Sequence, residues 1–414
     1  MHITILALGS QGDIKPYAAL GQGLKTAGHR VRMVSFENFA GMIDELGLDF
    51  HPIQGDAQAL VARAGASIRA LIGSFGSLAE SYARDFSDPR LGETDLFINQ
   101  LPVGLFGFDL AEKYNLPMVM AAVMPLARTS AFPVMGLPGL PLPGYNRASY
   151  YLGEQLAWQM FRKTINRWRE HTLELPPLPF LGYFNQLGTG RIPILNGFSS
   201  HVVNRPEDWG DHIHVTGYWF PEESAWQPSV ALQAFLDAGS PPVFVGFGSM
   251  PVKDPGRMTN IILEALEQTG QRGILHTGWA GIGHQALHHD VFVIDYAPYH
   301  WLFPRMSMVI HHGGSGTTSF GLRAGVPSWV VSFVFDQQFW GERIAALGVG
   351  PRPIRHTRLT SENLSEAIHQ GVNDPDMRQK AEDLGRNIRA ENGIENAIQI
   401  IATAGAELRS ARLK

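Results

Sequence analysis

The sequence contains no cysteine in its 414 residues. This absence excludes disulfides, thiolate metal sites and a cysteine nucleophile, and it fits a reducing compartment, so we expect a cytoplasmic protein. Long apolar runs are also absent, because the most apolar windows, 118–127 and 326–335, fall well short of the ~20 residues that span a bilayer. The amino terminus has neither a basic region nor a cleavage-site pattern, so we expect no signal peptide.

Charged residues are scarce, at 17% of the chain, and 33 Lys and Arg against 38 Asp and Glu give a net charge of −5. We therefore expect no nucleic-acid partner, while a peripheral membrane contact through a local patch stays open. Apolar residues make up 44% of the chain, which is ample for hydrophobic cores. A chain of this length favours two or more domains of roughly 150–200 residues.

Strand-like and helix-like segments alternate along the first half of the chain. Short apolar runs predict buried strands, and the helical patterns between them predict right-handed crossovers in a parallel sheet. The expected strands are 3–8, 31–35, 96–99, 118–123 and 201–204, and the expected helices are 16–27 and 107–114.

The segment 124–145 is apolar but rich in proline and glycine, so it predicts neither helix nor strand. Long loops of this kind are more often functional, as lids or pocket walls, than simple connectors. An aromatic-rich amphipathic pattern at 148–170 predicts a helix after the loop. On sequence alone, that helix is core packing at least as well as a ligand contact.

The second half repeats the same layout. The expected strands are 243–247, 273–276, 291–295, 308–311 and 328–333, and the expected helices are 257–269, 317–324 and 382–402. The fold class is therefore α/β, with two Rossmann-like domains that face each other across a cleft. Ligands of such sheets collect at the carboxyl ends of the strands.

We place the domain boundaries by composition. The segment after Trp219 is polar and bounded by proline, which is typical of a linker. The predicted division is 1–218 for the first domain, 219–232 for the linker and 233–385 for the second domain, with a further helix expected in 386–414.

The strongest local signal is the glycine-rich stretch at 310–318, between a predicted strand and a predicted helix. Glycines let the backbone approach a ligand closely, and the free N–H groups of a helix start favour an anion such as phosphate. The stretch matches neither the dinucleotide fingerprint nor a Walker loop. Tight packing and phosphate binding are equally good interpretations of it.

Two carboxylates follow predicted strands, and each has two interpretations. Asp336, beside Gln337, suits the reading of sugar hydroxyls, but it also suits capping of the next helix. Asp13 follows two glycines and precedes a helix with an early proline, Pro16. It is an equally good candidate for a helix cap and for a catalytic base.

Several motifs together resemble the GT-B glycosyltransferases that use nucleotide sugars, and most closely the sterol glucosyltransferases. The resemblance covers both domains and nearly the full length. It implies that 1–218 is an acceptor-binding domain, that 233–385 is a donor-binding domain, and that the helix in 386–414 returns to the first domain. The motifs are GSQGDIKPYAALGQGL (9–24), ARTSAFP (127–133), HVTGYWF (214–220), GFGSM (246–250), APYHWLFP (297–304), HHGGSGTTSFGLRAGVP (311–327) and DQQFWGERIAALGVGP (336–351).

The resemblance implies a donor site for UDP-glucose that needs no metal and no other cofactor. The backbone of 314–317, His312, Thr317 and Ser249 would hold the diphosphate, Asp336 and Gln337 the glucose, and Tyr296 and Ala297 the uracil. The implied donor-binding residues are Gly12, Ser249, Tyr296, Ala297, His312, Gly314, Ser315, Gly316, Thr317, Asp336 and Gln337. The sequence Asp-Pro-Asp at 374–376 matches the D-x-D motif of metal-dependent transferases, but the proline in a polar stretch is better explained by a surface turn.

The resemblance also implies an acceptor site and a base. Asp13 would deprotonate the acceptor hydroxyl, at a position where many relatives have histidine, and the product would be a β-glycoside formed with inversion. The acceptor would be a large apolar alcohol such as a sterol or related terpenoid. The implied acceptor-binding residues are Ser10, Met124, Arg128, Phe132 and Met135.

This chain departs from the sterol glucosyltransferase pattern at two points. Pro298-Tyr299-His300-Trp301 stands where Pro-His-Asp-Trp is usual, and the loop after Phe132 lacks the usual histidine or basic residues. The alternatives are therefore transfer of another nucleotide sugar to a polyketide, macrolide or flavonoid aglycone, a sugar-nucleotide epimerase, and a non-catalytic lipid- or nucleotide-binding protein.

Overall fold

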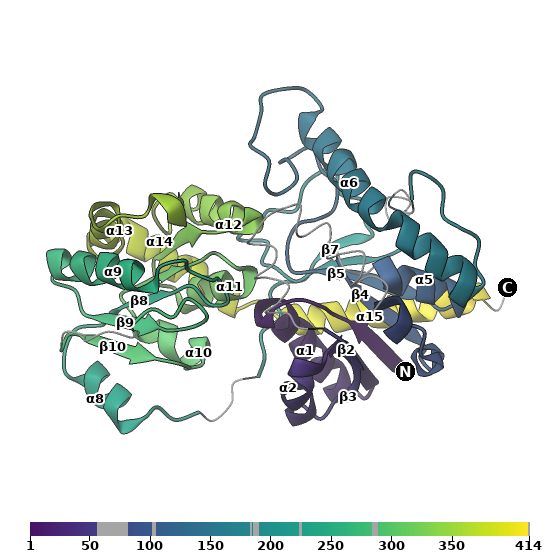
Figure 1. The fold of residues 1–414 in the computed structure, drawn as a ribbon, viewed down its shortest axis with the longest axis horizontal. Helices are drawn as coiled ribbons and strands as arrows, with labels where there is room; N and C mark the ends of the chain where they lie inside the picture. Colours follow the sequence, from purple (N-terminus) through teal and green to yellow (C-terminus); the bar gives the residue numbers. More distant parts are fainter. Residues whose placement is uncertain are drawn as a thin grey trace. The chain divides into compact units, whose positions relative to one another are not determined.

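The computed structural model forms two compact units (Figure 1). It describes residues 1–55, 82–101, 105–182, 184, 190–222, 226–283 and 289–412. Unit 1 is Met1–Pro221 together with Asn392–Lys414, and unit 2 is Glu222–Glu391. The first division falls after Pro221, inside the predicted linker 219–232, and the second falls after Glu391, whereas the sequence placed that boundary at 385. Residues 223–225 of the predicted linker lie outside the described residues.

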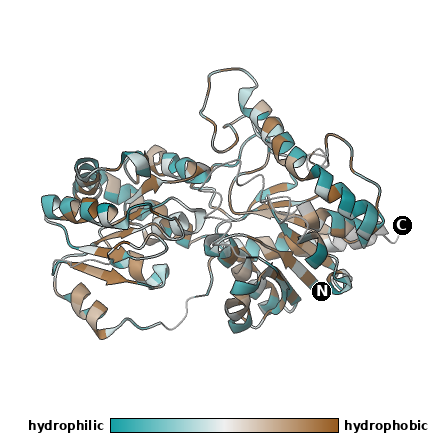
Figure 2. Cartoon of the chain, viewed as in Figure 1, coloured by the Kyte–Doolittle hydropathy of each residue, from teal (hydrophilic) through white to brown (hydrophobic). Residues whose placement is uncertain are grey.

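Unit 1 contains a parallel sheet, which the described residues build in the order β3-β2-β1-β4-β5-β6-β7. The central strands are buried on both faces, as the continuous apolar runs predict, and Figure 2 shows the strands of both units mainly in brown. The strands are β1 (His2–Leu6), β2 (Arg30–Phe36), β3 (Asp49–Ile53), β4 (Leu96–Gln100), β5 (Met118–Ala122), β6 (Ile194–Asn196) and β7 (Ile213–Val215).

The predicted strand at 201–204 is wrong. The N–H groups of Val202 and Val203 bond to the carbonyl of Ser199, and the Ser199 hydroxyl accepts from His201 N, so a hydroxyl and a carbonyl fold this stretch into a turn. The neighbouring strands are β6 and β7, which the sequence did not predict.

The helices of unit 1 include one that begins earlier than predicted. Helix α1 starts at Gln11 rather than Pro16, so Pro16 lies inside the helix and Asp13 is its third residue. The N-cap is Ser10, and the prediction of Asp13 as the N-cap is therefore wrong. The helices are α1 (Gln11–Thr26), α2 (Ala40–Glu45), α5 (Leu105–Lys113), α6 (Tyr145–Trp168) and α15 (Gly393–Arg412), with short helical turns at Glu37–Phe39, Pro89–Gly92 and Arg169–Leu173.

Unit 2 contains a second parallel sheet, in the order β10-β9-β8-β11-β12-β13 within the described part of the chain. All five predicted strands are present, with ends that differ by one residue at most. The strands are β8 (Val243–Gly246), β9 (Gly273–His276), β10 (Val291–Ile294), β11 (Met308–His311), β12 (Ser328–Ser332) and β13 (Ile354–Arg355).

The helices of unit 2 correct the prediction of one helix at 382–402. That stretch contains the end of α14 and the start of α15, because residues 390–392 between them are not helical. Gly393 then packs tightly on the backbone, where a Cβ would lie 2.3 Å from the Tyr218 carbonyl oxygen. The predicted turn at 374–376 is instead the start of α14, with Asp374 as its N-cap. The helices are α8 (Val230–Asp237), α9 (Pro255–Thr269), α10 (Tyr299–Leu302), α11 (Ser315–Ala324), α12 (Phe335–Ala346), α13 (Ser361–Asn373) and α14 (Pro375–Arg389), with short turns at Phe303–Arg305 and His356–Arg358.

Two features of unit 1 fix the long proline-rich loop and the helix that follows it. The loop has no helix or strand over 123–144, as predicted, and Asp208 holds it by accepting from the Thr129 hydroxyl at 2.7 Å and from Ser130 N at 2.7 Å. At the far end of α6, the buried Arg169 donates to Asp109 and to Glu112, both on α5.

No helix among the described residues is both long and apolar enough to cross a membrane.

The Arg169 cluster generates a stability prediction. Asp109 and Arg169 are almost fully buried, so Asp109→Ala leaves a buried cation without its buried carboxylate partner. We expect a loss of about 3–5 kcal/mol in urea unfolding followed by circular dichroism. Glu112→Gln is the matched control, because Glu112 is 40% exposed, and it should cost less than about 1 kcal/mol. Equal losses for the two variants would show that burial does not govern this cluster.

Candidate functional site

The candidate site of unit 2 lies where the strand order of its sheet reverses. Strands β9 and β10 follow β8 on one side, whereas β12 and β13 follow β11 on the other, so the carboxyl ends of β8 and β11 form the topological switch point. Ligands of open α/β sheets bind at such points. The loop after β8 carries the half-buried Ser249, and the loop after β11 carries His312.

The loop after β11 is closely packed and needs its glycines. Gly313 has φ +92°, and its N–H donates to Nδ1 of His311 at 3.0 Å, which holds the turn. The His312 ring packs over Gly314, two residues further on, because a Cβ on Gly314 would lie 2.5 Å from His312 Nε2. It also packs against Gly248 in the loop after β8. These contacts bring the GFGSM and HHGGSGTT motifs together.

The electrostatics of this loop favour an anion. Burial lowers the pKa of His312 to about 4, helped by the nearby His276, so the imidazole is neutral at pH 7. Its Nδ1 is buried and makes no hydrogen bond to any described residue. Helix α11 begins directly after Gly314 without a side-chain cap, so its positive end also faces this loop. A helix start and a neutral donor can together hold a phosphate.

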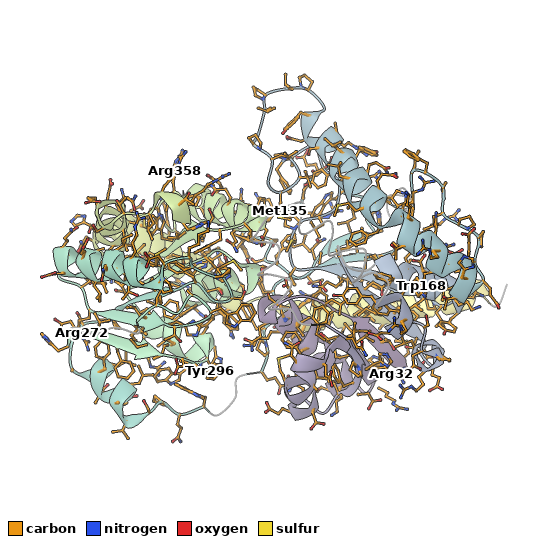
Figure 3. The ribbon with its side chains drawn as sticks, in the orientation of Figure 1. Arg32, Met135, Trp168, Arg272, Tyr296 and Arg358 are labelled. Carbon is orange, nitrogen blue, oxygen red and sulfur yellow. The ribbon has the colours of Figure 1, made fainter. Side chains whose placement is uncertain are left out.

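The predicted base-side residues lie on the loop after β10 and on α10. Tyr296, labelled in Figure 3, is 62% exposed, while Ala297 is buried. Tyr299 is half-buried, and desolvation of its phenol raises the pKa to about 12 although Thr317 hydrogen-bonds to it. The Thr317 hydroxyl predicted to contact a diphosphate is thus also a partner of Tyr299.

Asp336 and Gln337 have different local roles from those predicted. The N-cap of α12 is Val334, so the prediction of Asp336 as the cap is wrong, and Asp336 is a half-buried residue of the first turn. The capping bonds belong to Gln337, whose Oε1 accepts from Phe333 N at 2.7 Å and from Val334 N at 3.1 Å. The amide oxygen of Gln337 is therefore already engaged.

The candidate site of unit 1 lies at the equivalent switch point, between β1 and β4. Leu8 N donates to Oε1 of Gln100 at 2.6 Å, which ties the loop after β1 to the end of β4. Asp13 Oδ2 accepts from Ser10 N and from the Ser10 hydroxyl, both at 2.8 Å. Gly9, at φ +144°, is required here because a Cβ would lie 2.6 Å from Asp13 Oδ2.

The carboxylate of Asp13 keeps one oxygen available. Burial raises its pKa above the usual value, against the opposing effect of the Ser10 hydrogen bonds. Oδ1 makes no hydrogen bond to a described residue, whereas Oδ2 makes two. A half-buried carboxylate with a raised pKa and one open oxygen is suited to accept a proton.

The predicted acceptor-binding residues of unit 1 lie at the N-cap of α1 and in the long loop 123–144. The Ser10 hydroxyl is bound to Asp13, and Met124 packs on the core of unit 1. Arg128 donates to both oxygens of Glu154 at 2.9 Å and stacks over the Tyr151 ring at 3.9 Å, so it ties the loop to α6. Phe132 and Met135 are half-buried.

Three residues that position these sites, Gln100, Asp208 and His311, were not predicted from the sequence. Gln100 and Asp208 act across long sequence separations, and nothing in their local sequence indicates a partner. His311 had a signal, since it stands beside His312 and ends a buried strand. Its Nδ1 accepts a backbone N–H, and burial lowers its pKa to about 3.

Two family models match the chain. The model described as Glycosyltransferase family 28 N-terminal domain matches residues 3–86, and the model described as Erythromycin biosynthesis protein CIII-like, C-terminal domain, matches residues 274–402. Together they touch both units.

Curated relatives extend over nearly the whole chain. Sterol 3-beta-glucosyltransferase UGT80B1 of Arabidopsis thaliana is 35% identical over 420 residues, which is 96% of this chain and 67% of that protein. The chain belongs to the sterol glucosyltransferase family. Sterol 3-beta-glucosyltransferase UGT80A2 of the same plant is 35% identical, with 65% of its length covered, and that of Aspergillus terreus is 35% identical, with 30% covered. The chain thus spans about two thirds of the plant relatives and less than a third of the fungal one.

Solved structures give the fold. The glycotransferase of kitacinnamycin has a TM-score of 0.72 at 17% identity, with 97% of this chain and 98% of that one covered. The calicheamicin glycosyltransferase CalG4 has a TM-score of 0.68 at 18% identity, with 97% and 98% covered. The two α/β units therefore have the GT-B architecture that the sequence predicts.

The capping role of Gln337 generates a second prediction. Gln337→Ala leaves two backbone N–H groups of the β12–α12 turn without their acceptor, so the free energy of unfolding should fall by about 1–3 kcal/mol in urea titration. Gln337→Glu keeps an oxygen at the same place and should lose less. Gln379→Ala, on the exposed side of α14, is the control and should stay within about 0.5 kcal/mol. A loss in Gln337→Ala no larger than in this control would contradict the capping role.

Proposed function

We propose that this protein transfers glucose from UDP-glucose to the hydroxyl of a sterol or related terpenoid, with inversion to a β-glycoside and without a metal. The similarity to sterol 3-beta-glucosyltransferases over 96% of the chain carries the proposal. Two sites support it, namely an anion-binding loop in unit 2 and a half-buried carboxylate in unit 1.

The loop after β11 would stabilise the departing diphosphate. The start of α11 and the neutral imidazole of His312 would supply hydrogen-bond donors that are in place before the reaction. These donors would stabilise the negative charge that develops on the leaving diphosphate. Ser249 and Thr317 add hydroxyls. This set can neutralise a leaving diphosphate without a divalent cation, which addition of a chelator to the assay tests directly.

The glucose would be bound by the first turn of α12. Because the Gln337 oxygen is engaged by the backbone of the turn, the carboxylate of Asp336 is the group we assign to the sugar hydroxyls. Gln337 would contribute through its Nε2, which contacts the Met250 sulfur at 3.2 Å in this structure. The exposed ring of Tyr296 and the backbone of Ala297 would flank the uracil.

Asp13 would act as the general base. Its Oδ1 would take the proton from the acceptor hydroxyl while the hydroxyl oxygen forms a bond to the anomeric carbon of glucose. The bond from the anomeric carbon to the UDP oxygen would break at the same time, and both of its electrons would leave with UDP. The raised pKa makes the carboxylate a stronger base than a solvated aspartate. The two Ser10 bonds to Oδ2 would hold it in place.

A second candidate acceptor is a polyketide or macrolide aglycone, used with another nucleotide sugar. The match of residues 274–402 to the erythromycin-type model favours it. The substitution of Pro-Tyr-His-Trp at 298–301 also permits a base other than uracil.

The first test is the transfer reaction itself. The purified protein, incubated with UDP-glucose and a sterol, should release UDP and form a sterol glycoside that mass spectrometry detects, with and without chelator. A panel with dTDP-glucose, a macrolide aglycone and a flavonoid separates the second candidate. Sterol-independent loss of UDP-glucose with an epimeric product would indicate an epimerase, and binding without turnover of any pair would indicate a non-catalytic protein.

Asp13 variants separate a catalytic base from a purely structural role in the Ser10 capping box. Asp13→Asn keeps an oxygen for the Ser10 bonds, so folding and UDP binding should persist while kcat falls at least ~100-fold. Asp13→Ala also loses these bonds, and its unfolding free energy should fall by about 1 kcal/mol. Because the base works when ionised and its pKa is raised, wild-type kcat should fall as pH drops through a pKa above that of free aspartate. Normal turnover in Asp13→Asn would leave Asp13 with a structural role only.

A further inference from the structure

An imidazole from the edge of the sheet stacks on the turn between β12 and α12. Strand β12 ends at Ser332 and the N-cap of α12 is Val334, so Phe333 is the residue that connects them. The His356 ring, which directly follows β13, stacks on the Phe333 ring with 4.2 Å between the ring centroids and 3° between the ring planes. Its Nδ1 donates to the Ser332 carbonyl at 3.3 Å. The edge of the sheet thus holds the turn that leads into α12.

The neighbours of His356 point into solvent, whereas His356 does not. Arg355, Thr357 and Arg358 are exposed. Figure 3 shows Arg358, which ends this short turn, at the surface of unit 2. His356 is half-buried, with its ring against Phe333. The stack is therefore a contact of this one side chain and not general packing of the segment.

The stack extends from the turn to the loop that carries Ser249. The Phe333 ring also contacts the ring of Phe247, the first residue after β8, with 5.5 Å between centroids and 56° between planes. Phe247 is fully buried, so it holds Phe333 from the core side, while His356 holds it from the edge strand. The three rings therefore join β13, the β12–α12 turn and the loop after β8.

This stack supplies a constraint that the capping bonds of the turn lack. Gln337 accepts from the N–H groups of Phe333 and Val334, but Gln337 itself belongs to α12. Its bonds therefore tie the turn to the helix and do not by themselves tie the helix to the sheet. His356 follows a separate strand, so its ring fixes the turn relative to the sheet.

We propose that His356 is a positioning residue of the donor site, which sets the direction of the first turn of α12 and so holds Asp336 and Gln337 toward the glucose of UDP-glucose. The inference rests on the proposed function, because that function assigns the sugar to this turn. The diphosphate loop is held by a different bond, from Gly313 N to His311 Nδ1. Loss of the His356 ring should therefore weaken binding of the sugar and spare binding of UDP.

Calorimetry with UDP and with UDP-glucose separates the sugar from the nucleotide. His356→Asn keeps a donor near the Nδ1 position but removes the ring, and His356→Phe keeps the ring but removes the donor. We expect His356→Asn to bind UDP-glucose up to about tenfold more weakly, which is the most that an aromatic pair contributes, and to bind UDP within about twofold of the wild type. His356→Phe should bind both ligands as the wild type does.

Hydrogen exchange reads the same positioning without any ligand. The N–H groups of Phe333 and Val334 should exchange faster in His356→Asn than in the wild type or in His356→Phe. His369→Ala, which removes an exposed imidazole on α13, is the matched control and should equal the wild type in every measurement. Circular dichroism verifies that each variant is folded.

Three results would overturn the role of His356: unchanged exchange in His356→Asn, equal losses of UDP and UDP-glucose affinity in that variant, or a loss in His356→Phe as large as in His356→Asn. A wild type that does not bind UDP-glucose would instead contradict the proposed function. The exchange rates would then decide alone whether His356 holds the turn.

Discussion

Both candidate sites depend on a side chain at the third position of a helix that bonds back across the first turn. In unit 1 it is Asp13, which accepts from Ser10 N, and in unit 2 it is Gln337, which accepts from Val334 N. Each bond satisfies a backbone donor that the helix itself leaves unpaired. Each also fixes the chain as it leaves a central strand, so the residues around it are held at the carboxyl edge of the sheet.

Such a bond does not exclude a chemical role, because a carboxylate has two oxygens. Asp13 engages Oδ2 with Ser10 and keeps Oδ1 open, so one side chain can hold the turn and accept a proton. An amide has only one oxygen, and Gln337 uses it twice on the backbone. The adjacent Asp336 is thereby the better group for hydroxyls. The same local geometry thus leads to different assignments in the two units.

The sequence predicts the central strands of both sheets, because they are continuous apolar runs, but it misses β3, β6, β7 and β13 toward the sheet edges. It predicts the helix starts less well. Pro16 suggested a start that the structure places five residues earlier, at Gln11, since the Ser10–Asp13 pairing outweighs one proline in the helix. The 201–204 stretch has strand-like composition, yet the Ser199 bonds fold it into a turn. Contacts such as Ser130 with Asp208, 78 residues apart, have no local signal at all.

Helix α6 shows why a sequence pattern can support two interpretations at once. Its aromatic content indicates core packing, and Trp158 and Trp168 are indeed buried. Leu152 and Leu156, which precede both tryptophans, are also apolar but lie on the other side of the helix, at 58% and 61% exposure. Burying one face stabilises the helix, whereas leaving the other apolar face in water costs free energy unless something covers it.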